Sequence, residues 1–339
     1  MPVSAAIYGL AGHRLSEAER SFFSEVSPWG FILFARNIES PAQVLSLTND
    51  LRELAGRDDL PILLDQEGGR VARFRPPHWR AYPPGRRYGD LYARSPQEGL
   101  EAVKLASRLM AVELNAAGIN VDCLPVLDVP VRGAHDVIGD RAYGETPDVV
   151  IPLGRAAAEG LMEGGVLPII KHIPGHGRAG VDSHLNLPIV DTDVKTLNET
   201  DFAPFRALAH LPMAMTAHVV YAAIDATNPA TTSPKLINDI IRSVIGFDGL
   251  LMSDDVSMQA LSGSIGERTH ASFHAGCDIA LHCNGDMKEM LQVAVEAPVL
   301  NGDALRRSSA ALDHLALPQD FDETASLERF ASLMGSFWG

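Results

Sequence analysis

The segment Lys171–His184, KHIPGHGRAGVDSH, combines three histidines, an aspartate and a lysine in one short stretch. Its glycines Gly175, Gly177 and Gly180 also fit the pattern GxGxxG. Side chains of these types can bind a nucleotide, hold a metal ion or carry out acid–base catalysis. The context of the segment discriminates between these three functions.

The residues after the glycines argue against a nucleotide-binding turn. A dinucleotide-binding turn must open a helix, so that the pyrophosphate meets the helix N-terminus. Here the glycines precede VDSHLNLPIV, in which Asn186 and Pro188 would interrupt a helix. The sequence also lacks the phosphate-binding pattern GxxxxGK[ST]. We therefore expect no nucleotide cofactor.

A metal site is the second possibility. His172, His218 and Asp254 end three consecutive apolar runs, as ligands do in metal-dependent hydrolases built on barrels. Histidine is the commonest metal ligand in proteins. Such sites usually add an HxH pair after the first strand, whereas IYGLAGH supplies only His13. A metal-dependent hydrolase stays an alternative, and the preferred interpretation needs neither a metal nor another cofactor.

A mobile catalytic loop is the third possibility. The glycines allow the segment to close over a substrate. Asp182 and His184 are two residues apart, and in an extended segment such residues project to the same side. Asp182 could then accept a hydrogen bond from one imidazole nitrogen and orient the other toward the substrate. Its carboxylate would also favour the protonated ring that a general acid needs.

Eight short apolar runs provide the elements that would position these groups. They are centred near residues 7, 32, 63, 124, 169, 215, 251 and 280. They are apolar on both faces, as the strands of a buried parallel sheet must be. Helix-like stretches with Ser-Pro starts and glycine ends lie between them, at 40–56, 95–118 and 233–246.

This alternation predicts an α/β fold with a closed (β/α)8 barrel. We expect one catalytic domain over residues 1–339, with a helical tail from about residue 286, and an excursion around 73–94 after the third strand. In such barrels the catalytic groups come from the carboxyl ends of different strands. Polar residues end most of the apolar runs, namely Asp65, Gln66, Glu67, Asp128, Lys171, His172, His218, Ser253, Asp254, Asp255 and Asn284.

The composition limits the partners and the compartment. The net charge of −15 over 339 residues repels phosphate backbones, so we expect no nucleic acid and no membrane partner. Three scattered cysteines indicate reduced thiols rather than a disulfide framework. No run approaches the roughly 20 apolar residues of a membrane span, and no signal peptide is apparent. We expect a cytoplasmic monomer that acts on a small molecule.

Four motifs together resemble one enzyme family. KHIPGHG followed by DSH, MSDDVSM, LLDQEGGRVARF at 63–74 and VIGDRAYG at 137–144 are similar to the bacterial β-N-acetylhexosaminidases of glycoside hydrolase family 3. The resemblance is to the single-domain, cytoplasmic type that acts in peptidoglycan recycling. It covers roughly residues 5–290, with the motifs in the family's order. It implies a (β/α)8 barrel, which agrees with the strand count.

The resemblance also implies roles for individual residues. Asp254 would be the nucleophile, His184 the general acid/base and Asp182 its partner. The residues that would hold N-acetylglucosamine are Asp65, Arg73, Arg141, Lys171 and His172. Ile173 departs from the aromatic residue expected there in many relatives, which is a conservative change in a core position.

The implied reaction removes terminal, non-reducing N-acetylglucosamine from muropeptide fragments that end in anhydro-N-acetylmuramic acid. It proceeds with retention through a covalent glycosyl–Asp254 intermediate. A non-catalytic amino-sugar-binding protein is the remaining alternative. Other polar residues have structural interpretations: Asp255 as a turn cap, Lys171 as a possible partner of Glu67, and His176, His218 and Asp128 as core or supporting residues.

Overall fold

The structure, a computed structural model, describes residues 2–183 and 185–335. Eight parallel strands close into a barrel in the spatial order β1-β12-β11-β9-β7-β6-β3-β2. They are β1 (Ser4–Gly9), β2 (Pro28–Leu33), β3 (Ile62–Leu64), β6 (Val121–Asp122), β7 (Leu167–Ile173), β9 (Met213–Thr216), β11 (Leu250–Asp255) and β12 (Ile279–His282). Each strand coincides with one of the eight apolar runs, so the predicted (β/α)8 barrel is confirmed.

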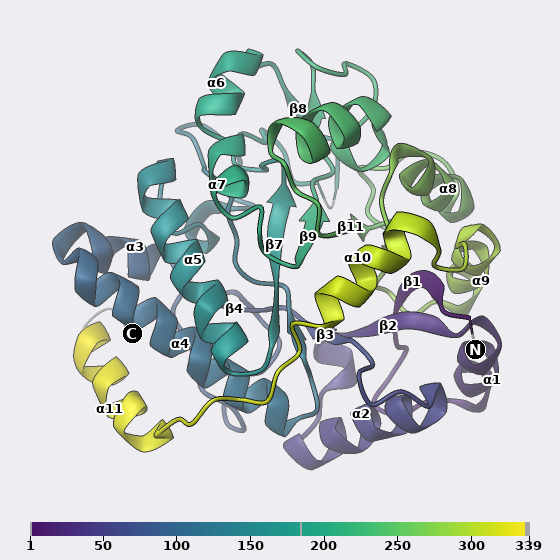
Figure 1. Cartoon of the computed structure of the whole chain (residues 1–339), viewed down its shortest axis with the longest axis horizontal. Helices are drawn as coiled ribbons and strands as arrows, with labels where there is room; N and C mark the ends of the chain where they lie inside the picture. The colour runs from purple at the N-terminus through teal and green to yellow at the C-terminus, as the bar shows by residue number, and fades with distance from the viewer. Residues whose placement is uncertain (1, 184, 336–339) are drawn as a thin grey trace.

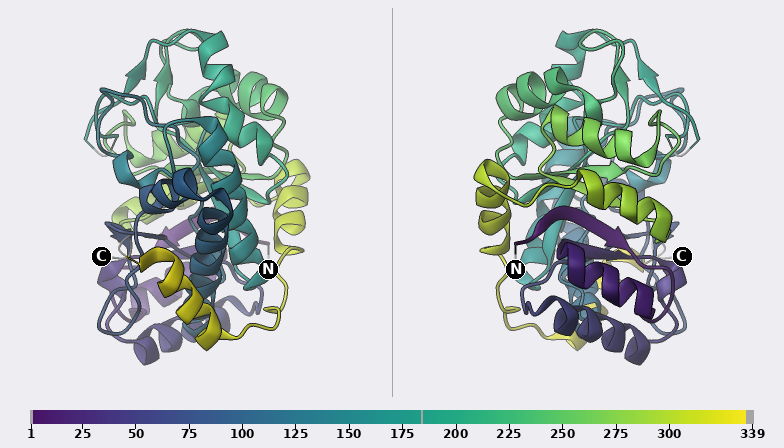
Figure 2. Two further views of the ribbon diagram at one scale, coloured as in Figure 1. Left: turned by 90° about the vertical axis from the view of Figure 1, so that its left-hand side faces the viewer. Right: turned by 90° about the vertical axis from the view of Figure 1, so that its right-hand side faces the viewer.

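Helices surround the strands on the outside of the barrel (Figures 1 and 2). In chain order the connecting helices are α1 (Glu17–Val26), α2 (Pro41–Ala55), α4 (Pro96–Ala116), α5 (Pro147–Glu163), α6 (Val194–Glu199), α7 (Phe202–Ala207), η4 (Leu236–Val244), α8 (Ile265–Ala275) and α9 (Met287–Glu296). A chain that alternates strand and helix in this way pairs its strands in parallel.

The helix ends follow the signals in the sequence, with one difference in winding. The hydroxyl of Ser40 accepts a hydrogen bond from the N–H of Gln43, and Gly56 ends α2 in the left-handed conformation. Ser233 caps the third predicted helix in the same way. That helix, however, is wound with i to i−5 hydrogen bonds, such as the one from Ile245 N–H to the Ile240 carbonyl. A helix therefore lies where the cap residues indicate it, and only its pitch differs from that of an ordinary α-helix, which cap residues do not determine.

An excursion follows β3, as predicted. It consists of the antiparallel hairpin β4 (Gln66–Gly68) and β5 (Val71–Ala72), followed by α3 (Gly85–Arg94). The side chain of Gln66 donates to the Phe74 carbonyl and accepts from the N–H groups of Arg73 and Phe74. These three hydrogen bonds hold Arg73 next to the end of β3. A second small pair, β8 (Ile189–Val190) and β10 (Val220–Tyr221), lies outside the barrel.

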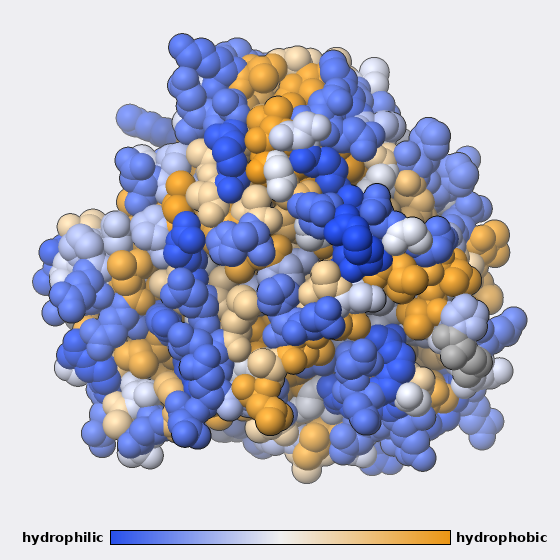
Figure 3. Space-filling model, in the orientation of Figure 1, coloured by the Kyte–Doolittle hydropathy of each residue, from blue (hydrophilic) through white to orange (hydrophobic). Residues whose placement is uncertain are grey.

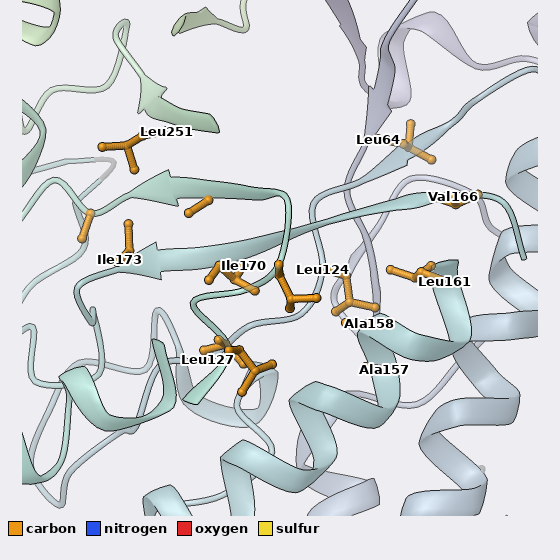
Figure 4. Packing of buried hydrophobic residues seen from close by; sticks show 14 of the residues in the cluster. Leu64, Leu124, Leu127, Ala157, Ala158, Leu161, Val166, Ile170, Ile173 and Leu251 are labelled. Atoms are coloured by element: carbon orange, nitrogen blue, oxygen red, sulfur yellow. The ribbon is translucent and has the colours of Figure 1, made fainter. Parts of the chain in front are cut away.

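Apolar side chains fill both the inside and the outside of the barrel. Leu63, Val121 and Leu167 are aligned on neighbouring strands and belong to the inner cluster. Ile170 points the other way and joins the outer cluster with the side chains of α5 (Figure 4). Burying an aliphatic side chain of this size contributes about 1.5–3 kcal/mol. Ile173 is fully buried in the outer cluster, which confirms it as a core position.

The chain ends with two further helices, α10 (Gly302–Leu312) and α11 (Glu323–Met334). The segment between them crosses the molecule, so that α11 packs against α4 (Figure 1). The face drawn in Figure 3 is largely hydrophilic, with separate apolar areas. Among the described residues, no helix has the length and apolar character needed to cross a membrane.

Candidate active site

One cavity of about 310 Å³ lies at the carboxyl ends of the barrel strands. Six of the predicted site residues line it, namely Asp65, Arg73, Arg141, Lys171, His172 and Asp254. Asp65 follows β3 and Asp254 lies in β11, and these two strands are four positions apart in the eight-stranded barrel. The two carboxylates therefore face the cavity from opposite sides of the barrel.

A continuous ionic network forms one wall of the cavity. The Nζ of Lys171 lies 2.8 Å from Asp65 Oδ1 and 2.6 Å from Glu67 Oε1. Arg73 Nη2 lies 2.8 Å from the second oxygen of Asp65, and Arg141 binds both oxygens of Glu67 at 2.8 Å. Three cations and two carboxylates leave the network with one net positive charge. The predicted pairing of Lys171 with Glu67 is confirmed.

The network keeps its members charged. Burial alone would raise the pKa of Asp65, but the charges of Lys171 and then Arg73 outweigh it and hold that pKa well below its usual range. Burial would likewise lower the pKa of Lys171, and Asp65 and Glu67 raise it instead. The pKa of Glu67 is also lowered, because Arg141 and Lys171 offset its burial. The wall thus offers fixed charges and donors to hydroxyl or amide groups.

A second buried carboxylate, Asp128, holds two histidines. Its Oδ2 lies 2.6 Å from His172 Nδ1, and its Oδ1 accepts the main-chain N–H groups of His172 and His176. Burial would raise the pKa of Asp128, but His172 lowers it. Because the carboxylate must accept, Nδ1 of His172 carries the proton. Its Nε2 is then the ring nitrogen left to contact a substrate.

The adjacent aspartates of β11 have different surroundings. Asp255 accepts hydrogen bonds from the N–H and hydroxyl of Ser257 and from the N–H of Cys283. It caps the turn after the strand, as predicted. Asp254 is half-buried at the cavity, with Oδ1 accepting the Asp255 N–H at 2.8 Å. Asp254 therefore faces the cavity, whereas Asp255 supports the turn.

His218 has both ring nitrogens engaged and offers neither to a metal ion. Its Nδ1 lies 2.7 Å from Thr231 Oγ1, and its Nε2 lies 3.0 Å from the Asp255 carbonyl oxygen. Burial lowers the pKa of this ring, so it stays neutral near pH 7. Within residues 2–183 and 185–335, no group of three or more His, Cys, Asp or Glu side chains could hold a metal ion. His218 instead fixes the end of β11.

Asp182 lies beside the central cavity. It lines an adjoining hollow of about 330 Å³ that shares Val71, Val137 and Arg141 with that cavity. Its carbonyl oxygen accepts hydrogen bonds from the N–H groups of Leu185 and Asn186, so the chain turns here. The expectation of an extended segment is wrong, because asparagine, aspartate and glycine nearby favour a turn. The predicted acid/base residue His184 lies outside the described residues.

Sequence reasoning missed or left open four side chains at the site. Ser183 and Phe34 line the cavity, and nothing in the sequence separates them from ordinary loop or core residues. His176 also lines the cavity, and Asp128 accepts a hydrogen bond from the main-chain N–H of His176. The signals were the place of His176 in the histidine-rich motif and the place of Asp128 at the end of an apolar run. Neither signal indicated what the side chain contacts.

The family profile of the glycosyl hydrolase family 3 N terminal domain matches residues 6–314. The chain belongs to glycosyl hydrolase family 3. A β-hexosaminidase of Alkalilimnicola ehrlichii is 41% identical over 288 residues, which cover 84% of this chain and 82% of the relative. Another, from Bordetella pertussis, is 35% identical over 336 residues, which cover 97% of this chain and 94% of the relative.

A solved structure supports the same assignment. NagZ from Neisseria gonorrhoeae, in complex with N-trifluoroacetyl-D-glucosamine, is 32% identical with a TM-score of 0.88, and the match covers 98% of both chains. These relatives show that this family 3 chain is a glycoside hydrolase with β-N-acetylhexosaminidase activity, of the NagZ type.

Proposed function

We propose that the enzyme hydrolyses its substrate with retention, through a covalent intermediate on Asp254. The observation that carries this proposal is that Asp254 lines the same cavity as Asp65, Lys171 and Arg141 of the ionic network. A sugar ring held by the network from one side of the barrel presents its anomeric carbon to the carboxylate on the other side. The half-buried Asp254 reaches that carbon through the cavity.

The proposed first step joins the sugar to the enzyme. An oxygen of Asp254 attacks the anomeric carbon, and the bond to the leaving-group oxygen breaks. His184, as imidazolium, donates its proton to that oxygen, and Asp182 supports the charged ring. The hollow beside Asp182 lies next to the central cavity and gives the leaving group room.

In the second step water replaces Asp254 at the anomeric carbon. The neutral His184 takes a proton from the water, and Asp254 leaves as a carboxylate. Two displacements restore the β configuration. An imidazole suits both steps, since its ordinary pKa of about 6.5 lets it donate and accept near neutral pH.

We propose terminal, non-reducing β-linked N-acetylglucosamine as the sugar, and muropeptide fragments that end in anhydro-N-acetylmuramic acid as the natural substrates. The complex of gonococcal NagZ with an N-acylated glucosamine supports the sugar. The fixed donors of Lys171, Arg73 and Arg141 and the ring of His172 suit its hydroxyl and amide groups. We also propose that residues 1–339 act as one catalytic unit, with a helical tail.

The test is to trap the intermediate. The enzyme is incubated with a fluorinated N-acetylglucosaminyl donor that slows the second step, and the intact protein is weighed by mass spectrometry. We expect the added mass of one glycosyl group on Asp254, and no added mass in Asp254→Asn. A first-formed product with inverted configuration, or labelling of another residue, would contradict the proposal.

A further inference from the structure

The loop after β7 is anchored in its first half by contacts to three other segments. His176 donates its main-chain N–H to Asp128 at 2.7 Å, and Arg178 donates to Asp201 at 2.7 Å. The hydroxyl of Tyr221 donates to the Gly175 carbonyl. The segment 174–178 is therefore held at three points, by a residue after β6 and by residues in the elements outside the barrel.

The second half of the loop is held inward at Ser183. This side chain is only 3% exposed and lines the central cavity, whereas Val181 and Leu185 on either side are 37% and 68% exposed. Serine is usually exposed and valine and leucine are usually buried, so this stretch reverses the usual pattern of burial. The contact that compensates is with His176, whose Nε2 lies 2.9 Å from Ser183 Oγ.

The buried ring of His176 carries two polar nitrogens, so an apolar side chain would fill the same space at a lower cost in free energy. It is 3% exposed, and its Nδ1 is buried with no hydrogen-bond partner among the described residues. Leaving a buried polar atom unpaired is unfavourable. The contact with Ser183 is thus the hydrogen bond that an imidazole, and not an apolar ring, supplies here. Burial and the neighbouring His172 lower the pKa of His176 to about 4, so this contact stays between neutral groups near pH 7.

We propose that His176 and Ser183 are positioning residues that hold the loop at Asp182 against the mouth of the cavity. The inference rests on the acid/base role proposed above for Asp182 and His184. Asp128 orients the imidazole of His172 and also holds the main chain of His176. One buried carboxylate therefore keeps the proposed sugar-binding ring and the acid/base segment at a constant relative position.

The test compares two substrates that differ in their need for an acid. Phenyl N-acetyl-β-glucosaminide has a poor leaving group, and the dinitrophenyl glycoside leaves without protonation. In Ser183→Ala and His176→Asn we expect kcat/KM for the phenyl substrate to fall about three- to tenfold, because one hydrogen bond is lost. For the dinitrophenyl substrate we expect kcat/KM to fall less than about twofold. His176→Gln, whose terminal amide can reach Ser183, should retain most of the activity.

Two comparisons make the test specific. Because Ser183 and His176 act through one contact, the double variant Ser183→Ala with His176→Asn should lose no more than either single variant. Ser308→Ala is the matched control, since it removes an equally buried hydroxyl that accepts from the ring nitrogen of Trp29 at 2.7 Å, near the start of β2. It should leave the ratio of the two rates unchanged.

Equal losses on both substrates in Ser183→Ala and His176→Asn would overturn the inference, because that result indicates a purely structural role. Asp182→Asn separates this failure from failure of the proposed function. If Asp182→Asn is selectively poor on the phenyl substrate and the two loop variants are not, only the positioning role is wrong. If Asp182→Asn shows no selectivity either, the acid/base assignment fails with it.

Discussion

Two adjacent aspartates show how contacts decide what a residue does. Asp255 accepts three hydrogen bonds that close the turn after β11 and tie it to Cys283. Asp254 is open to the cavity on which the proposed chemistry depends. Their chemical type is the same, and their order in the motif alone gives no physical reason for the difference. The contacts of Asp255 with Ser257 and Cys283 give the reason for its supporting role.

This contrast predicts different effects of the alanine substitutions Asp255→Ala and Asp254→Ala. Asp255→Ala should lower the free energy of unfolding by about 1–3 kcal/mol, because it leaves buried donors unpaired. Asp254→Ala should lower it less and abolish hydrolysis. Urea unfolding and hydrolysis of an aryl N-acetyl-β-glucosaminide measure the two effects. Full activity in Asp254→Ala would contradict the assignment of the two residues.

A second prediction at the scale of residues concerns the buried ionic network around Lys171. Asp65→Asn leaves Lys171 and Arg73 with one charged partner fewer and should cost about 3–5 kcal/mol at pH 7. The pKa of Asp65 is lowered by folding, so its carboxylate stabilises the protein above the ordinary pKa of about 3.9 and loses this effect at lower pH. The difference between the variant and the wild type should therefore shrink below about pH 4. Urea unfolding at pH 7, 4 and 3 tests this, and a constant difference would contradict it.

At the scale of elements, the strands and the end of the barrel that holds the site could be predicted from the sequence. The conformation of the loop after β7 could not. Strands buried on both faces leave apolar runs such as the one at Leu250–Met252, and the polar residues after them mark one end of a parallel barrel. The turn at Asp182 depends on main-chain hydrogen bonds that no periodicity encodes. The contact between His176 and Ser183 depends in turn on Asp128, which is far from both in the sequence.

The neutral ring of His176 predicts how the enzyme responds to acid. Folding lowers the pKa of this ring to about 4, against about 6.5 in an unfolded chain. Between these values the unfolded chain binds the proton more readily, so this residue contributes to a loss of stability as pH falls, up to about 1.4 kcal/mol per pH unit. His176→Gln lacks the titrating group. Its unfolding free energy, measured in urea from pH 7 to 4, should fall less steeply than that of the wild type, and equal slopes would count against a neutral buried ring.

At the scale of the whole molecule, helix α11 packs against segments that come much earlier in the sequence. The chain crosses the molecule after α10, and α11 packs on α4 (Figure 1). The ring of Phe330 lies 6.2 Å from Tyr82 and 6.5 Å from Tyr88, between centroids. The Tyr82 carbonyl accepts the Gly69 N–H from the hairpin that precedes Arg73. Packing of α11 thus supports the segment that carries a wall of the cavity.

Phe330→Ala should therefore destabilise the protein by about 3–5 kcal/mol, as expected for a fully buried aromatic side chain. It should also raise KM more than it lowers kcat, because Arg73 and Asp65 lose support while Asp254 on the opposite side of the barrel does not. The adjacent variant Arg329→Ala is the control, since it removes only an exposed ion pair with Glu101. Its thermal midpoint should stay almost unchanged. A Phe330→Ala protein that is destabilised but has unaltered KM would show that α11 contributes to stability alone. The hairpin would then hold the proposed sugar-binding wall without α11.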